Sequence, residues 1–318
     1  MTRSDTKRRR STIKVIDTRY IRRNLAASHL LIEEGAALFV DTGPAPAVDY
    51  LLAGLAEEQL TPNDVRYIVL THIHLDHAGG AGELMRRCPR ATLLVHPKGA
   101  GHMIDPEKLI TASIDIYGAE LFKKLYGTIT AIDKDRVVAV EDGYLLSFHG
   151  RTLQFFDTPG HARHHLSIWD RAGNGIFTGD TLGLALPELQ IPEMPPFLMP
   201  TTSPAAFDPD ALEQSIKRLM SLRPAILYLT HFGPVQADRH SVDRLIELIR
   251  RHADLGRPPQ RPEPASLTAP IHDLLFASYL DYCREYGGIP IDTARFDELL
   301  AGDVELNAQG VAIWSARQ

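Results

Sequence analysis

The stretch THIHLDHAGG, Thr71–Gly80, places three histidines and one aspartate within six consecutive positions. A structural loop has no need of four ionisable groups at this density, and burying them without partners would be costly. His72 and His74 are two residues apart just after an apolar run, so an extended backbone turns both imidazoles to the same side. Asp76 and His77 follow where AGGAGE predicts the start of a helix, so they point at a neighbouring position. The pattern HxHxDH therefore predicts a metal site.

Four apolar runs that are typical of strands each lead into a residue that can bind metal. YIVL leads to His72, LQFF leads through DTPGH to His161, GIF leads through TGD to Asp180, and ILYL leads to His231. In open α/β sheets, sites form beyond the carboxyl ends of the strands. We therefore expect these four strand ends to converge on one cleft from distant parts of the chain.

The candidate donors divide into two sets. We expect one ion to be held by His72, His74 and His161, and a second by Asp76, His77 and His231, with Asp180 bridging the two. Imidazole and carboxylate ligands with open positions suit catalytic zinc, and iron and manganese accept similar sets. The predicted cofactor is therefore a pair of divalent metal ions, with zinc preferred. His164 and His165 follow His161 too closely for all three to share one ion, which argues against them as ligands.

The composition excludes several classes of function. The formal net charge of the 318 residues is −6, so no overall basic field attracts nucleic acid or anionic lipid. No apolar run approaches the ~20 residues of a membrane span. The basic cluster Lys7–Arg10 has no apolar segment behind it and is not a secretory signal. Cys88 and Cys283 form no CxxC pair, which is typical of a reducing compartment. We therefore expect a cytoplasmic protein that binds a small molecule and neither nucleic acid nor membrane. The sequence leaves the oligomeric state open, with a homodimer as one alternative.

Short apolar runs bounded by turn residues dominate the first 235 residues and predict strands. These runs are 13–16, 29–32, 37–40, 67–70, 92–95, 137–140, 153–156, 166–169, 175–177 and 226–229. Helical patterns lie between them, over residues 45–59, 81–87, 107–126, 209–221 and 242–252. Strands mixed with helices in this way predict an α/β or α+β layered domain.

Residues 183–209 form a segment with seven prolines and many apolar side chains. A loop that is both proline-rich and apolar is more typical of a functional lid than of a flexible linker. Its side chains, with Phe197 and Leu198 among them, either form a wall over the cleft, pack on the segment 107–126, or belong to the core. The wall predicts a substrate with an apolar portion.

The stretch GRPPQRPEP, residues 256–264, has the composition of a linker. Beyond it, apolar residues at helical spacing predict an amphipathic helix over residues 266–286, whose apolar face must pack on a partner. We therefore divide the chain into a catalytic domain, residues 1–255, and a helical extension, residues 256–318, packed on it.

Five short motifs in fixed order resemble those of the metallo-β-lactamase superfamily. They are VDTG, THIHLDH, TPGH, TGD and THFG, and the resemblance covers residues 13–232. It implies a four-layer αββα sandwich with a two-metal site at one edge. It also implies that Asp41 of VDTG orients a ligand, which is a usual role of carboxylates behind metal-binding histidines; a plain turn residue is the alternative.

Two features indicate which group of the superfamily the chain resembles most. Asp180 stands where the secreted antibiotic-degrading members carry a cysteine ligand, which argues against penicillin hydrolysis as the main activity. TPGHARHHLS, Thr158–Ser167, resembles the TPGHTxGHxS of the glyoxalase II group. The helices expected after Gly256 are also similar to the helical substrate-binding region of that group, although no specific substrate residue can be matched.

The resemblance and the donor set together predict a dinuclear metal-dependent hydrolase. We expect a metal-bound hydroxide to attack the carbonyl of a thioester, ester or lactone, with Asp76 as the proton acceptor. Tyr117, Tyr126 and Tyr228 are candidate oxyanion donors, and packing is the alternative role for each.

Three other functions fit parts of the pattern. A mononuclear iron enzyme resembling the persulfide dioxygenases would use His72, His161 and Asp180 alone. A small-molecule phosphodiesterase would use the same metal pair, and a non-catalytic metal-binding module would need no open coordination position. The number and kind of bound ions distinguish the first of these from a dinuclear hydrolase.

Overall fold

The computed structural model describes residues 11–202, 204, 206–257 and 261–318. The basic cluster Lys7–Arg10, residues 258–260 of the expected linker and the side chain of Tyr117 lie outside the described residues. No helix within the described ranges is long and apolar enough to cross a membrane.

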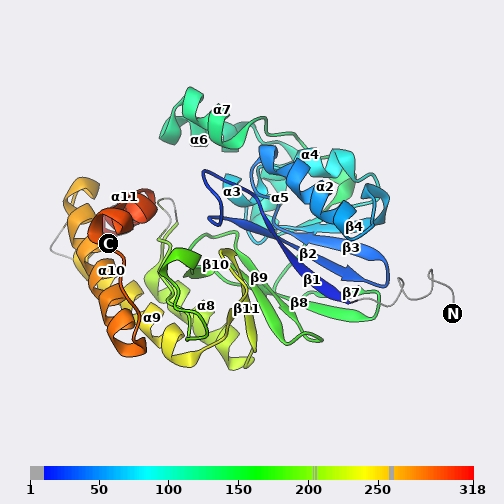
Figure 1. The fold of residues 1–318 in the computed structure, drawn as a ribbon. Helices are drawn as coiled ribbons and strands as arrows, with labels where there is room; N and C mark the ends of the chain where they lie inside the picture. The colour runs from blue at the N-terminus through cyan, green and yellow to red at the C-terminus, as the bar shows by residue number, and fades with distance from the viewer. Residues whose placement is uncertain (1–10, 203, 205, 258–260) are drawn as a thin grey trace.

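Two six-stranded sheets, counted over the described residues, form the centre of the molecule (Figure 1). The first sheet has the order β1 (Thr12–Asp17), β2 (Ala27–Glu33), β3 (Ala36–Val40), β4 (Val65–Val69), β5 (Thr92–Val95), β6 (Val137–Ala139). The second has the order β12 (Val235–Gln236), β11 (Ile226–His231), β10 (Gly175–Leu184), β9 (Leu166–Asp170), β8 (Arg151–Asp157), β7 (Leu145–Phe148). Each sheet is therefore built from one continuous half of the chain.

Helices pack on the outer sides of both sheets, and others lie at the edges of the sandwich. Those of the first half are η1 (Ala45–Ala47), α2 (Val48–Glu57), η2 (Pro62–Asp64), α3 (Leu75–Ala78), α4 (Ala81–Arg87), α5 (Pro97–Ile104), α6 (Glu107–Tyr117), α7 (Ala119–Tyr126) and η3 (Lys134–Arg136). Those of the second half are η4 (Pro187–Leu189), α8 (Pro209–Ser221), α9 (Arg239–Gly256), α10 (Pro264–Tyr286) and α11 (Thr293–Ser315).

Three apolar cores separate the layers. Phe39 and Leu93 lie with side chains of α2 and α4 in the core outside the first sheet. Phe155 and Leu38 belong to the core between the two sheets. Ile176 packs with α8 to α11 in the core outside the second sheet. The layers follow the order helix, sheet, sheet, helix, which confirms the αββα sandwich that the sequence predicts.

Strand direction brings the carboxyl ends of several strands to one edge. In the first sheet β3, β4, β5 and β6 run parallel, and in the second β10 and β11 run parallel. Parallel strands end at the same edge of their sheet. The segments that follow β4, β8 and β11 therefore meet at one edge of the sandwich.

Asp180 differs from the expectation, because it lies inside a strand and not after its end. β10 continues to Leu184, and its pairing with β11 shifts register on both sides of Gly179. Gly179 has a φ of 51°, and a Cβ there would lie 2.5 Å from His165 Nε2. This irregularity takes the place of the turn that TGD predicts.

The segment 183–209 packs into the core outside the second sheet. Phe197 and Leu198 are each 1% exposed, and the Phe197 ring lies 5.6 Å from that of Tyr279 and 5.3 Å from that of Tyr282. The expectation of a wall over the cleft, or of packing on residues 107–126, is therefore wrong for these two side chains. The reason is that α10 presents an apolar face, and this segment covers it.

The helical predictions differ in detail from the structure. α10 confirms the helix expected over residues 266–286, and α11 lies within the helical extension expected over residues 256–318, for which no further helix bounds were predicted. The segment 107–126 is two helices, because Gly118 has a φ of 76° and breaks it. Side chains of α10 and α11 share one core with those of α8 and α9. The division of the chain at residue 255 stays a prediction.

Candidate metal centre

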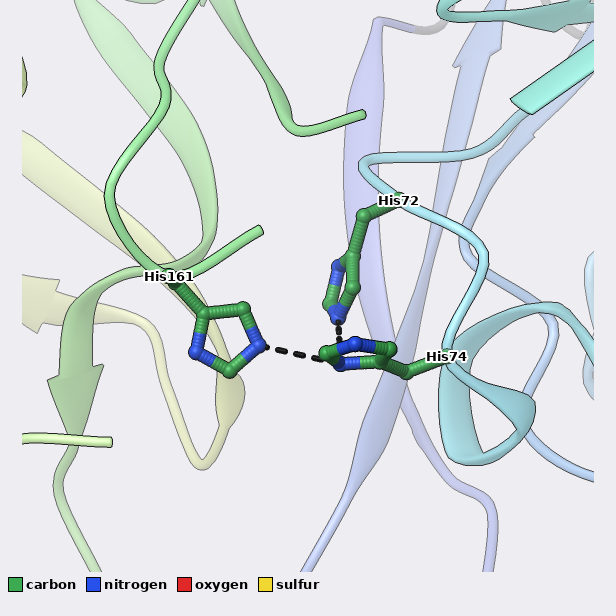
Figure 2. A group of neighbouring side chains, drawn as sticks. All are labelled: His72, His74 and His161. Carbon is green, nitrogen blue, oxygen red and sulfur yellow. Dashed lines mark hydrogen bonds between the residues drawn. The ribbon is translucent and has the colours of Figure 1, made fainter. Parts of the chain in front are cut away.

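Three imidazoles meet at the edge of the sandwich (Figure 2). His72 and His74 follow β4, and His161 lies in the turn between β8 and β9. His74 Nδ1 lies 2.9 Å from His72 Nε2 and 3.0 Å from His161 Nε2. One nitrogen from each ring thus faces a common point, as the motifs HxHxDH and TPGH predict for the first donor set.

A second group lies beside the first. Asp76 and His77 are on the single turn of α3, and His231 ends β11. His231 Nε2 lies 3.3 Å from Asp76 Oδ2 and 3.3 Å from His77 Nε2. The structure therefore brings the second expected set together, with residues from both sheets.

The Asp180 carboxylate lies between the two groups. Its Oδ2 is 3.4 Å from His161 Nε2, and its Oδ1 is 3.2 Å from His77 Nε2 and 3.6 Å from that of His231. Among the described residues, Oδ1 is buried and has no hydrogen-bond partner. A buried anionic oxygen that makes no hydrogen bond is costly unless a cation lies close to it, either a protonated imidazole such as His77 or a metal ion. The residues present thus fit a bound divalent cation.

Asp41 holds the second group in place from behind. Its Oδ2 accepts from His77 Nδ1 at 2.9 Å and from the hydroxyl of Thr230 at 2.9 Å. Its Oδ1 accepts from the backbone N–H of Thr71 at 2.8 Å. His77 Nδ1 therefore carries the proton in this contact, and its Nε2 faces the centre with a free lone pair when the ring is neutral. The contact is the one that the resemblance implies for Asp41.

Backbone carbonyls direct two further rings. His231 Nδ1 donates to the carbonyl oxygen of Leu25 at 2.8 Å, and His161 Nδ1 donates to that of Thr201 at 3.1 Å. In both rings the Nε2 is left for the centre. Thr201 belongs to the segment 183–209, so the backbone of that segment reaches the metal centre although its apolar side chains do not.

The sequence did not predict a role at the metal centre for two further residues, His165 and Asp303. His165 is fully buried; its Nε2 accepts from the backbone N–H of Asp180 at 3.1 Å, and its Nδ1 lies 2.8 Å from the Thr158 hydroxyl. His165 therefore holds the backbone of Asp180 in place, and it belongs to neither of the two donor groups. Asp303 on α11 interacts electrostatically with His231, and burial raises its pKa to about 6. No local motif marks Asp303, since it lies on a helix far along the chain.

The electrostatics of the centre show strong coupling between carboxylates and imidazoles. Burial alone would lower the pKa of His231, but Asp180 and Asp76 raise it to about 9. Burial likewise opposes the ionisation of Asp180, but His77 lowers its pKa well below the usual range. Burial and neighbouring histidines lower the pKa of His72. Protons on His77 and His231 therefore balance the carboxylates, and a divalent cation would compete with those protons.

The candidate oxyanion donors do not face the centre where their side chains are described. The Tyr228 ring stacks on Phe177 at 4.8 Å between the sheets, and the Asp170 charge contributes to its raised pKa after burial. The hydroxyl of Tyr126 lies 2.9 Å from that of Tyr20 in a separate apolar cluster. Packing explains both positions.

A sandwich of two sheets with clustered His and Asp side chains at one edge defines a class of metal-binding proteins. Residues 22–231 match the family model described as the metallo-beta-lactamase superfamily. This match covers more than half of the chain, and the chain belongs to that superfamily.

Individual proteins of known sequence or structure are similar to this chain. The chain is 30% identical over 196 residues to the metallo-beta-lactamase fold-containing protein ST1585 of Sulfurisphaera tokodaii, which covers 60% of this chain and 70% of the relative. The ST1585 structure superposes with a TM-score of 0.63 and 22% identity over 94% of this chain and 97% of that one. The structure of TTHA1429 from Thermus thermophilus gives a TM-score of 0.60 and 23% identity over 86% of this chain and 94% of that one. These structures show a shared fold.

One relative has a name that states an activity. The hydroxyacylglutathione hydrolase of Salmonella paratyphi A is 29% identical over 150 residues, which is 47% of this chain and 44% of the relative. The chain thus spans less than half the length of this hydrolase.

Proposed function

We propose that this protein hydrolyses a thioester, ester or lactone with the help of two divalent metal ions, preferably zinc. The observation that carries the proposal is the position of Asp180 between two donor groups, with a buried oxygen that makes no hydrogen bond to any described residue. A single ion would need only one group. The relation to a hydroxyacylglutathione hydrolase supports a carbonyl substrate.

The residues that would hold the ions are the seven side chains described above. Bound divalent ions supply Lewis acidity toward water and toward a carbonyl oxygen. The chain itself supplies the proton acceptor. Asp76 is 21% exposed against 6% for Asp180, so its carboxylate is the more accessible to substrate and water. His77 and His231 keep the pKa of Asp76 low although burial opposes them, so the group is available as a base.

The substrate that we propose has an apolar portion. Leu75, next to Asp76, packs with Phe122, Tyr126 and Ile129 under α6 and α7. Because Leu75 is next to Asp76 in α3, we propose that the apolar portion of the substrate packs at the edge of this cluster. We further propose that the protein works in a reducing compartment, the cytoplasm, because Cys88 and Cys283 are buried and not joined in a disulfide.

Metal analysis followed by a substrate panel tests the proposal. Protein purified without chelator should contain about two ions per chain, and it should hydrolyse thioesters or lactones in preference to phosphodiesters. His231→Ala should lose metal from the second group, whereas His240→Ala, on the exposed face of α9, should keep full content. One iron per chain with oxygen-consuming oxidation of a persulfide would overturn the proposal. Full metal content and full activity in His231→Ala would overturn the two-ion arrangement.

A further inference from the structure

The loop between β1 and β2, residues 18–26, lies next to the metal centre. The carbonyl of Leu25 accepts the Nδ1–H of His231, and the Tyr20 hydroxyl contacts that of Tyr126 under α7. Tyr20 also packs with Leu75 of α3, beside which the loop is seen in Figure 1. The loop therefore connects the second donor group with the apolar cluster.

This loop holds an unfavourable backbone conformation. Arg19, Ile21 and Asn24 have φ angles of 55°, 58° and 57°. The left-handed region is rare for residues other than glycine and is a true outlier for a β-branched one. Ile21 is moreover 65% exposed, so no buried contact of its side chain accounts for the conformation. Such strain is common where a loop is shaped for a ligand.

Arg22 lies between these strained positions and joins the loop to the segment that follows β10. Its Nη1 donates to Glu188 Oε1 at 2.8 Å, and Glu188 lies in η4, shortly after β10. Within the described part of the chain, Arg22 Nη2 and Glu188 Oε2 are buried and have no hydrogen-bond partner. One ion pair thus contains one unmatched donor and one unmatched acceptor, and both are costly to leave so.

Backbone contacts place this ion pair near the metal centre. Leu25, three residues after Arg22, accepts from His231 Nδ1, and the backbone N–H of Ala185, three residues before Glu188, donates to the carbonyl of His231. The segments that carry Arg22 and Glu188 are therefore both hydrogen-bonded to His231.

We propose that Arg22 and Glu188 bind a secondary amide of the substrate. Arg22 Nη2 donates to the amide carbonyl, and Glu188 Oε2 accepts the amide N–H. A carboxylate satisfies Arg22 but places its charge against Glu188, and an ester lacks the N–H that Glu188 needs. The inference rests on the proposed function, and it names the group that the hydrolase recognises beside the scissile carbonyl.

Two matched thioesters test this recognition. The hexanoyl thioesters of N-acetylcysteamine and of 2-acetoxyethanethiol differ only in an amide N–H against an ester oxygen. Wild-type protein should hydrolyse the amide probe with a kcat/KM at least about tenfold higher, because the ester leaves Glu188 unmatched. Glu188→Ala and Arg22→Ala should bring this ratio close to one. Arg244→Ala removes the ion pair to Glu285 between α9 and α10 and should keep the wild-type ratio.

A wild-type ratio near one, or a ratio that survives both substitutions, overturns the amide inference and leaves the hydrolase proposal intact. If neither thioester is hydrolysed, and the ester and lactone substrates of the panel also stay intact, the proposed function fails. Isothermal titration with the two corresponding thioethers then decides the amide inference, since these bind without reacting. Tighter binding of the amide thioether supports it, and equal affinity or no binding of either overturns it.

Discussion

Asp180 faces both donor groups with different oxygens, and this makes its carboxylate the most consequential of the candidate ligands. In Asp180→Ala, nothing offsets the repulsion between two cations at this point, and both donor groups lose a ligand. We expect metal content to fall from about two ions to one or fewer, and turnover to fall by more than about 100-fold. Elemental analysis and kinetics on the same preparation measure both. Asp210→Ala, at an exposed position in the first turn of α8, serves as the control.

Asp76 is proposed to accept a proton, and an amide cannot do so at neutral pH. Asp76→Asn should therefore lower kcat by about 100-fold or more, within the usual range for loss of a general base. Stopped-flow or steady-state assays with a thioester measure the loss at equal metal content. Unchanged turnover in Asp76→Asn would remove this residue from the chemistry.

His231 makes the stability of the metal-free protein depend on alkaline pH. Its pKa is raised to about 9 in the folded chain, against about 6.5 when unfolded. The stability gained from its proton is therefore complete below about pH 6.5 and is lost as the pH rises through about 9. With chelator present, Tm should fall between pH 7 and pH 10, and His231→Gln should show a smaller fall. An identical pH dependence of Tm in both proteins would contradict this assignment.

The sequence predicts which donor residues come together, but it does not predict the residues that surround them. HxHxDH is a local pattern, and strand ends that precede His161 and His231 indicate where the chain returns. Asp303 and the Arg22–Glu188 pair approach the centre through the packing of α11 and η4. No spacing in the sequence records such packing, so these residues become visible only in the structure.

The segment 183–209 contributes both to the apolar core and to the metal centre. Its apolar side chains fill the core against α10, and the backbone at Thr201 holds His161. Phe197→Ala should therefore lower the free energy of unfolding by about 3–5 kcal/mol, the usual cost of deleting a buried aromatic ring. Urea unfolding measures this loss. The order of preference among substrates of different acyl chain length should stay the same. A changed order would mean that the Phe197 side chain contacts the substrate.

Most strands could be predicted because each is a short apolar run between turn residues. β7 and β12 were missed, since one alternates exposed and buried residues over four positions and the other has only two residues. The bounds of α11 could not be predicted within the helical extension because Gly302, Gly310 and Asn307 interrupt its sequence, while the Asn307 side chain is matched by Thr202 and Pro200. Such matching is tertiary and overrides weak helix propensity.

At the scale of the whole molecule, the centre joins the two halves of the sandwich. Residues of both sheets contribute to each donor group, so a bound ion crosslinks the halves in the folded state only. Removal of metal should lower Tm, and restoring zinc at about 100 times its Kd should return about 2.7 kcal/mol of stability. Calorimetry with and without chelator measures the difference. An unchanged Tm would mean that the ions, if present, do not link the sheets.

The division of the sheets along the chain also sets an order of maturation during synthesis. β1 to β6 leave the ribosome before β7 to β12, and with them come His72, His74, Asp76 and His77. Each group then still lacks its distant histidine, His161 for one and His231 for the other, and the shared Asp180 is absent as well. If the two groups bind metal as proposed, we expect the nascent first half to bind it only weakly, and lasting metal uptake to begin after β11 has been made.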